Sequence, residues 1–220
     1  MPLFDWQFAL EILPQLARAA VVTIEATILG FALAATLGLV LAILRMSRNP
    51  WVSVITAGFV EFIRSTPVLI QIFFLFFVFP RFGVVIPALT AGVLALGIHY
   101  ACYCSEVYRA GIQAIPRGQW EAAVALNLSP WRTYRDVIIP QAIPPVVPAL
   151  GNYLIGMFKE TPLLSAIAVL ELMQTAKIIG SETFRYLEPI TMVGVFFLVM
   201  SLVSAAGVRR VEAWVKSRRG

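Results

Sequence analysis

Several charged and polar side chains of this sequence stand inside long apolar stretches, where a charge finds few partners. Glu61 and Arg64 are three residues apart, so on a helix they lie one turn from each other and can form an ion pair. Alternatively, Arg64 faces a polar path together with Thr66 and Gln71 and binds the carboxylate of a solute. A charge at the centre of a bilayer costs at least about 2.5–3.5 kcal/mol, so either arrangement must compensate it. The sequence alone leaves both interpretations open.

A second group follows Asn152 and consists of Lys159, Glu160 and Thr161, with Pro162 directly after it. A proline inside a helix has no amide hydrogen and leaves an upstream carbonyl free, which is tolerated where a cavity or a neighbour supplies a donor. One interpretation is a kinked helix in which Lys159 and Glu160 neutralise each other. The other, which we favour, places Asn152, Lys159 and Thr161 along a solute pathway.

The remaining buried polar groups have more ordinary explanations. Glu106 lies three residues before Arg109, which predicts a local ion pair. His99 is the only histidine, and we expect it to make an interhelical hydrogen bond, with a gating role as the alternative. Cys102 and Cys104 are two residues apart and point to different faces of a helix, so neither a disulfide nor a metal pair is expected.

No catalytic centre is expected. The three lysines follow Phe158, Ala176 and Val215, so the chain has no Gly-Lys of a phosphate-binding loop. No serine stands in a G-x-S-x-G elbow, and no cluster of His, Cys or carboxylates suggests a metal site. The sequence therefore predicts neither an enzyme nor a cofactor.

The composition indicates that lipid is the main solvent of these side chains. Of the 220 residues, 60% are hydrophobic and 13% are charged, and the mean hydropathy is +0.84; soluble domains average about 45–50% apolar and about 25% charged. A spanning helix needs about 20 apolar residues. The fold class predicted is an all-α integral membrane protein, one domain over residues 1–220, with about five spans at 16–44, 52–79, 84–114, 142–172 and 189–208.

The arginines and lysines predict the orientation. If the N-terminus is outside, eleven of them fall in inner segments: Arg45, Arg48, Arg109, Arg117, Arg132, Arg135, Arg209, Arg210, Lys216, Arg218 and Arg219. Four fall in outer segments: Arg18, Arg81, Lys177 and Arg185. Positive residues concentrate on the cytoplasmic side of membrane proteins, so we expect the N-terminus outside and the C-terminus inside. The net charge of +5 is spread between apolar runs rather than gathered on one soluble surface, so no nucleic-acid partner is expected.

The one long inner segment, residues 115–141, has the local signals of a helical hairpin. A first helix is expected over residues 119–126, with Trp120, Ala123 and Val124 on one face. Asn127 then suits a left-handed residue after the helix, and Ser129-Pro130 suits an N-cap followed by the first helical position. A second helix should follow and end at Pro140. Packing under the bundle and docking of a partner are equally compatible with this pattern.

Three motifs in this region carry a resemblance to a known family. They are Gly118-Gln-Trp-Glu-Ala-Ala123, Leu126-Asn-Leu-Ser129 and Val137-Ile-Ile-Pro-Gln141. Together they resemble the EAA coupling loop of ABC importer permeases. The strings Glu106–Gly111, Phe62–Pro67 and Lys159–Leu163 are similar to the polar amino-acid branch, the histidine, glutamine and arginine type. The chain departs from the pattern at Asn127, where the family has Gly, and at Pro162, where it has Ser.

The resemblance implies a permease subunit in the plasma (inner) membrane of a bacterium, with ATP hydrolysed on a separate cytoplasmic ATPase subunit. It implies that Glu121 pairs with a basic residue of that ATPase, while Ala122, Ala123 and Asn127 belong to the same docking loop. A soluble solute-binding protein outside the cytoplasm and a second permease, identical or similar, complete the implied assembly. The implied cargo is a polar amino acid or a similar zwitterion, and the Ala-Leu-Asn variant resembles relatives that handle ectoine. Two other classes remain as alternatives, an ion-coupled secondary transporter and a membrane scaffold without a pathway.

Overall fold

The computed structural model describes residues 4–217, and every regular segment in this range is helical. Arg218 and Arg219, which contributed to the charge count, lie outside the described residues. The main helices are α1 (Trp6–Arg45), α2 (Pro50–Arg64), α3 (Val68–Phe73), α4 (Ala88–Gln113), α7 (Ile139–Glu160), α8 (Leu172–Thr183) and α9 (Leu187–Ser217). Between them lie the short elements η1 (Phe74–Val78), η2 (Phe79–Phe82), α5 (Arg117–Ala125), α6 (Pro130–Arg132), η3 (Thr133–Ile138) and η4 (Thr161–Ile167). The predicted all-α membrane class is confirmed.

Four helical stretches within the described residues are long and apolar enough to cross a bilayer, and they are Trp6–Arg45, Ala88–Gln113, Pro130–Ile167 and Leu187–Val215. The pair Pro50–Arg64 and Val68–Phe82 supplies a fifth crossing if the two are counted as one span. Several helices are longer than the spans predicted from hydropathy. A predicted span ends where the apolar residues end, whereas a helix continues into polar sequence as far as its backbone hydrogen bonds continue. At the start of α1, for example, the Asp5 carboxylate accepts hydrogen bonds from the amides of Gln7 and Phe8.

Close packing of α1 against α4 forms the centre of the bundle. The buried face of α1 carries a small residue every fourth position, namely Ala26, Gly30, Ala34, Gly38 and Ala42. Such spacing lets two backbones approach in a membrane, where helix association depends on van der Waals contact. At Gly38 the approach is so close that an added Cβ would lie 2.7 Å from the Cys104 Cβ and 2.8 Å from the Ala101 carbonyl oxygen.

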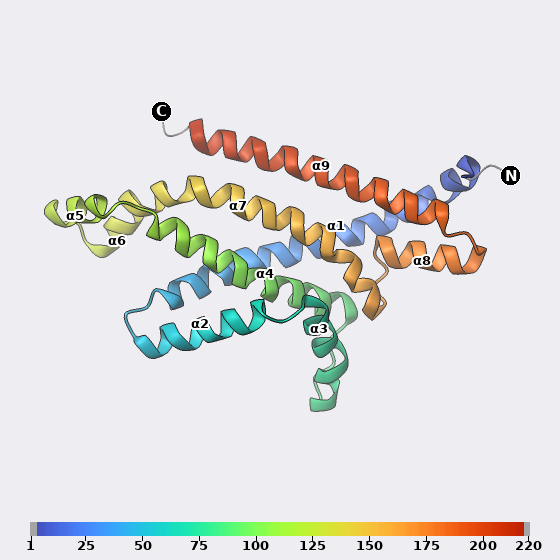
Figure 1. Ribbon diagram of the computed structural model, residues 1–220, viewed down its shortest axis with the longest axis horizontal. Helices are drawn as coiled ribbons and strands as arrows, with labels where there is room; N and C mark the ends of the chain where they lie inside the picture. The colour runs from blue at the N-terminus through green and yellow to red at the C-terminus, as the bar shows by residue number, and fades with distance from the viewer. Residues whose placement is uncertain (1–3, 218–220) are drawn as a thin grey trace.

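The second predicted span, 52–79, is not one straight helix. The chain bends by 101° between Arg64 and Val68, and α3 with its following turns projects away from the other helices (Figure 1). Pro67 causes the break, because it has no amide hydrogen and disfavours helical geometry at Thr66. Further along, the phenylalanine-rich segment forms a π-helical turn over Phe74–Val78.

The second hairpin helix does not end at Pro140, contrary to the prediction. Its chain passes from α6 through the π-helical η3 into α7 without interruption. The wider turn precedes Pro140, which occupies the first turn of α7, where a missing amide hydrogen is least costly. The predicted fourth span, 142–172, is also divided, because α7 gives way to the 3-10 helix η4 at Thr161.

The two ends of the bundle differ. The hairpin of α5 and α6 lies at the same end as the C-terminus, whereas the N-terminus and α8 lie at the opposite end (Figure 1). At that opposite end Arg185 contacts Asp5 at 3.1 Å and Glu188 at 2.7 Å, which joins the start of α1 to the turn before α9. The Phe8 amide and the Arg185 guanidinium lower the pKa of Asp5, so the carboxylate that caps α1 stays ionised.

The α1–α4 contact predicts a large effect of one methyl group. Gly38→Ala should destabilise the detergent-solubilised protein by about 1–3 kcal/mol, because the α4 backbone must move away from the added carbon. Gly58→Ala is the matched control, since nothing lies within 4 Å of its Cβ position; removing an exposed helical glycine stabilises by about 0.5–1 kcal/mol. Thermal unfolding followed by size-exclusion chromatography measures both. Equal melting temperatures for the two variants would contradict the close approach.

Candidate functional site

The hairpin at one end of the bundle is built by local backbone signals. Asn127 adopts the left-handed conformation with φ 53°, as predicted. Its amide donates to the Val124 carbonyl at 2.9 Å, and the Leu128 amide donates to the Ala123 carbonyl at 3.0 Å. These two bonds form the Schellman motif that ends α5. The Ser129 side chain accepts a hydrogen bond from the Arg132 amide, so the predicted N-cap is also confirmed.

The outward face of the hairpin differs from the one predicted. Glu121 and Ala122 are exposed, whereas Ala123 is buried beneath them. Val124, predicted to share a face with Ala123, instead points to solvent, with 76% of its surface exposed. Leu126 is exposed to a similar extent. The hairpin therefore presents one carboxylate beside exposed apolar side chains, and the sequence reasoning missed the contribution of Leu126.

The inside of the hairpin is held by aromatic packing. The ring of Trp120 meets the ring of Tyr134 edge to face, with centroids 5.4 Å apart. Gln141 at the start of α7 donates to the Gln119 side chain at 3.0 Å. Because α5 and the second half of the hairpin are tied in this way, they present their outward face as one unit.

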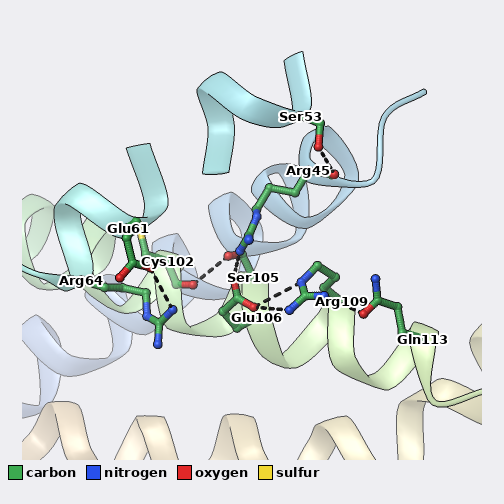
Figure 2. A network of polar contacts seen from close by, with 9 residues as sticks. All are labelled: Arg45, Ser53, Glu61, Arg64, Cys102, Ser105, Glu106, Arg109 and Gln113. Atoms are coloured by element: carbon green, nitrogen blue, oxygen red, sulfur yellow. Dashed lines mark hydrogen bonds and ion pairs between the residues drawn. The ribbon is translucent and has the colours of Figure 1, made fainter. Parts of the chain in front are cut away.

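A network of charges joins the end of α1 to α4 (Figure 2). Glu106 accepts two hydrogen bonds from Arg109, at 2.7 and 3.2 Å, which confirms the predicted local pair. Glu106 also forms an ion pair with Arg45 at the end of α1. Arg109 in turn donates to Gln113 at 2.6 Å. The side chains of the three ionised residues are only 20–30% exposed, so solvent screens these contacts weakly.

A polar cluster fills the break of the second span. The Gln71 amide nitrogen lies 2.8 Å from the Ile63 carbonyl and 2.8 Å from the Thr66 hydroxyl. The same nitrogen lies 3.1 Å from Nδ1 of His99 on α4, so His99 makes the predicted interhelical hydrogen bond. The cluster thus satisfies carbonyls that the break leaves free.

Arg64 lies at the edge of this cluster and interacts with two groups. Its guanidinium stands 5.1 Å from the centre of the Tyr103 ring, a cation–π geometry. Its nearest carboxylate oxygen, on Glu61, is 3.7 Å away, and the Glu61 side chain is 72% exposed. Tyr103 also packs against Tyr153 of α7, with ring centroids 5.7 Å apart. The tyrosines around Arg64 were not identified from the sequence.

The structure separates the predicted pathway residues of α7. Asn152 and Lys159 are both exposed, and their spacing of seven puts them on one face of the helix. Thr161 is fully buried, and its hydroxyl donates to the Phe158 carbonyl at 2.7 Å. Lys159 makes no ion pair with Glu160 or any other described residue; the Glu160 carboxyl faces the Tyr100 hydroxyl instead. The alternative of a self-neutralised pair at the kink is therefore not what the structure contains.

The polar groups at the break of the second span are suited to reversible binding. Among residues 4–217, no three His, Cys, Asp or Glu side chains are placed to hold one metal ion. The chemistry available at the break is that of a cation, amides, hydroxyls and aromatic faces. Such groups bind the polar ends of small molecules reversibly.

Comparison with known proteins gives matches along nearly the whole chain. Residues 34–217 match the family described as "Binding-protein-dependent transport system inner membrane component". A relative from Sinorhizobium fredii, called "Probable amino-acid ABC transporter permease protein y4tG", is 49% identical over 211 residues, which cover 96% of this chain and 91% of the relative. The "Glutamine transport system permease protein GlnP" of Escherichia coli is 34% identical over 215 residues, 97% of this chain and 98% of that one.

Two solved structures have the same fold. A chain of the structure titled "Crystal structure of an amino acid ABC transporter with histidines" matches with a TM-score of 0.90 and 36% identity, over 96% of this chain and 98% of that chain. A chain of the MetNI methionine ABC transporter in inward-facing conformations matches with a TM-score of 0.72 and 20% identity, over 96% and 99% of the two chains. The second likeness concerns the fold alone.

The charge network between α1 and α4 predicts unequal roles for two glutamates. Glu106→Gln leaves Arg45 and Arg109 facing each other without an anion, so it should lower stability by an amount approaching the ~3–5 kcal/mol typical of a broken buried pair. Glu61→Gln removes an exposed carboxylate 3.7 Å from its partner and should cost at most about 1 kcal/mol. Thermal melting of both variants at low and high salt tests this. A Glu106→Gln protein that melts with the native one would show that the network contributes nothing to stability.

Proposed function

Since this chain belongs to the family of binding-protein-dependent transport system inner membrane components and is the permease subunit of an amino-acid ABC importer, we propose how its parts serve transport. Residues 1–220 form one permease domain, with the hairpin and the C-terminus in the cytoplasm and the N-terminus outside. The distribution of arginines supports this orientation, because the C-terminal ends of α1 and α4 and the hairpin lie at one end of the bundle (Figure 1), and Arg45, Arg48, Arg109 and the hairpin arginines belong to these segments or follow them directly.

The hairpin docks on a cytoplasmic ATPase subunit. Its exposed face, with the Glu121 carboxylate next to Ala122, Val124 and Leu126, has the composition of a small contact surface with one charged anchor. Within the described residues Glu121 forms no ion pair, so its charge is available to a basic side chain of the ATPase. Asn127 acts through the backbone, because it fixes the turn that follows this face. Ala123 lies on the buried side of α5, where its small side chain lets the helix pack closely.

The permease works as a pair, with an identical or similar partner. Asn152, Lys159 and Glu25 are exposed on helices that cross the bilayer, and a charge facing lipid there is costly. A second permease, or a water-filled path between two permeases, would remove these side chains from lipid. The exposure of these polar side chains on helices that cross the bilayer is the observation that supports pairing.

The solute is a polar amino acid or a zwitterion of similar size, released into this path by a soluble binding protein. Arg64, Thr66 and Gln71 belong to the binding surface for it, and Asn152, Lys159 and Thr161 to the α7 side of the path. The Arg64 Nε and the Gln71 amide oxygen are both buried without a hydrogen-bond partner in the described chain, so they are available to a carboxylate and an ammonium group. Ectoine is a zwitterion of this class and belongs in the panel of solutes to be tested. Alternating access, driven by closure of the ATPase pair against the hairpins, completes the mechanism.

The docking proposal is tested by reversing one charge. Glu121→Lys should abolish copurification of the ATPase subunit and solute uptake, because a repulsive contact replaces an attractive one. Glu182→Lys, the same change at an exposed position of α8 at the opposite end, is the control and should leave both intact. If no ATPase binds the native chain and the purified chain alone moves solute in vesicles, the secondary-transporter alternative is correct.

The pathway proposal is tested by removing positive charge inside the spans. Arg64→Gln and Lys159→Gln should each reduce uptake at least tenfold in proteoliposomes, while the complex with the ATPase remains assembled. Lys177→Gln, at an exposed site on α8, should transport normally. Loss of assembly in the Arg64 and Lys159 variants, with no separate effect on flux, would support the scaffold alternative instead.

A further inference from the structure

A concave surface lies beside the second half of the hairpin. It is a groove of about 840 Å³ between the end of α1, the end of α4, the second half of the hairpin and the start of α7. Apolar side chains form nearly all of its wall, including Leu39, Ile43, Tyr108, Trp131, Tyr134 and Ile143. None of the groups assigned to docking or to the solute path lines it, so it needs an occupant of its own.

One end of the groove lies along an apolar stretch that is long enough to cross a bilayer. Leu39 and Ile43 lie within the last two turns of α1, inside the apolar stretch that crosses the bilayer. Trp131 and Tyr134 form the other end, and Trp131 is 71% exposed. Tryptophan and tyrosine favour the interface between lipid tails and water. An apolar groove at this depth is suited to an acyl chain.

Three arginines stand close in the sequence to residues that line the groove. Arg48 follows the lining residue Ser47 by one position, and Arg132 follows the lining residue Trp131. Both are exposed, and within the described residues neither forms an ion pair. Arg135 is four residues from both Trp131 and Ile139, which also line the groove, so it lies along the same edge of the helix. The carboxylate nearest to Arg135 is Asp136, at 3.7 Å, with both side chains more than half exposed.

We propose that this groove binds an anionic phospholipid of the leaflet on the hairpin side. The acyl chain packs along Leu39 and Ile43, and the phosphate is held by Arg48, Arg132 and Arg135. Basic pockets between transmembrane helices on the cytoplasmic side are suited to anionic headgroups. The assignment to the cytoplasmic leaflet rests on the orientation proposed above, whereas binding itself does not. The bound lipid contacts both the hairpin and α1, so it fills the space between the docking element and the bundle.

Trp131 provides a direct probe of the occupant. The permease is assembled with its ATPase in nanodiscs after Trp6, Trp51, Trp120 and Trp214 have been replaced by Phe, and the same protein with Trp131→Phe gives the blank. Brominated phosphatidylglycerol should quench Trp131 at a lower mole fraction than brominated phosphatidylcholine. Each arginine near an anionic surface changes affinity by about fivefold, so Arg48→Gln with Arg132→Gln should reduce the preference about 25-fold.

The control removes the same charge from the same end of the protein. Arg209→Gln with Arg210→Gln, on exposed positions of α9, should keep the preference. If the double variant at the groove does not assemble, the native arginines are tested by salt instead, and 0.5 M salt should weaken the preference by screening.

Three results would overturn the proposal. Equal quenching by the two lipids means that an acyl chain enters without headgroup selection. No quenching by either lipid means that protein, either the second permease or the ATPase, covers the groove. Loss of preference in the α9 control means that general surface charge attracts the lipid. Quenching is read without solute or ATP, so a failure of the transport mechanism proposed above leaves this result interpretable.

Discussion

The close approach of α1 and α4 is the constraint on which the other contacts depend. Five small residues at four-residue intervals, from Ala26 to Ala42, give α1 a nearly flat face, and α4 packs against it with its own Gly97, Ala101 and Cys104. In lipid there is little hydrophobic force between helices, so this stability comes from van der Waals contact over the whole face. The same approach brings the Tyr108 hydroxyl to the Ala35 carbonyl, at 3.2 Å, and Arg45 to Glu106.

One side of α4 packs against α1, and its other sides contact α2, α3 and α7. His99 contacts Gln71 of α3, Tyr103 contacts Arg64 of α2, and Tyr100 and Tyr103 pack on Tyr153 of α7. The polar cluster therefore lies against α4, and the packing of α4 on α1 determines where α4 stands. The consequence is that Arg64 of α2 and Gln71 of α3, both proposed to bind solute, share α4 as their common neighbour.

The sequence predicts well those features that depend on a short stretch of chain alone. The hairpin turn followed from Asn127 and Ser129, because a left-handed residue and an N-cap act on amides within a few positions. The apolar lengths of the spans followed from the bilayer thickness. The Arg45–Glu106 pair could not be found in this way, since it joins helices 61 positions apart in the chain. A reading of α1 for small residues at every fourth position would have predicted its packing face, and that signal was missed.

The prolines show why local rules fail in this setting. Pro67 breaks its helix, and the Gln71 amide donates to the carbonyls of Ile63 and Thr66 at the break. Pro140 causes no such break, because it lies in the first turn of α7, directly after the wider π-helical turn. The first half of α7 contains three more prolines, at 144, 145 and 148, each of which removes one hydrogen bond from the helix. Beyond them, Gly151 is packed so closely that an added Cβ would lie 2.3 Å from Val208 of α9. Resistance to bending is therefore lowest between the hairpin and Gly151, and a force on the hairpin is expected to bend α7 there before it separates α1 from α4.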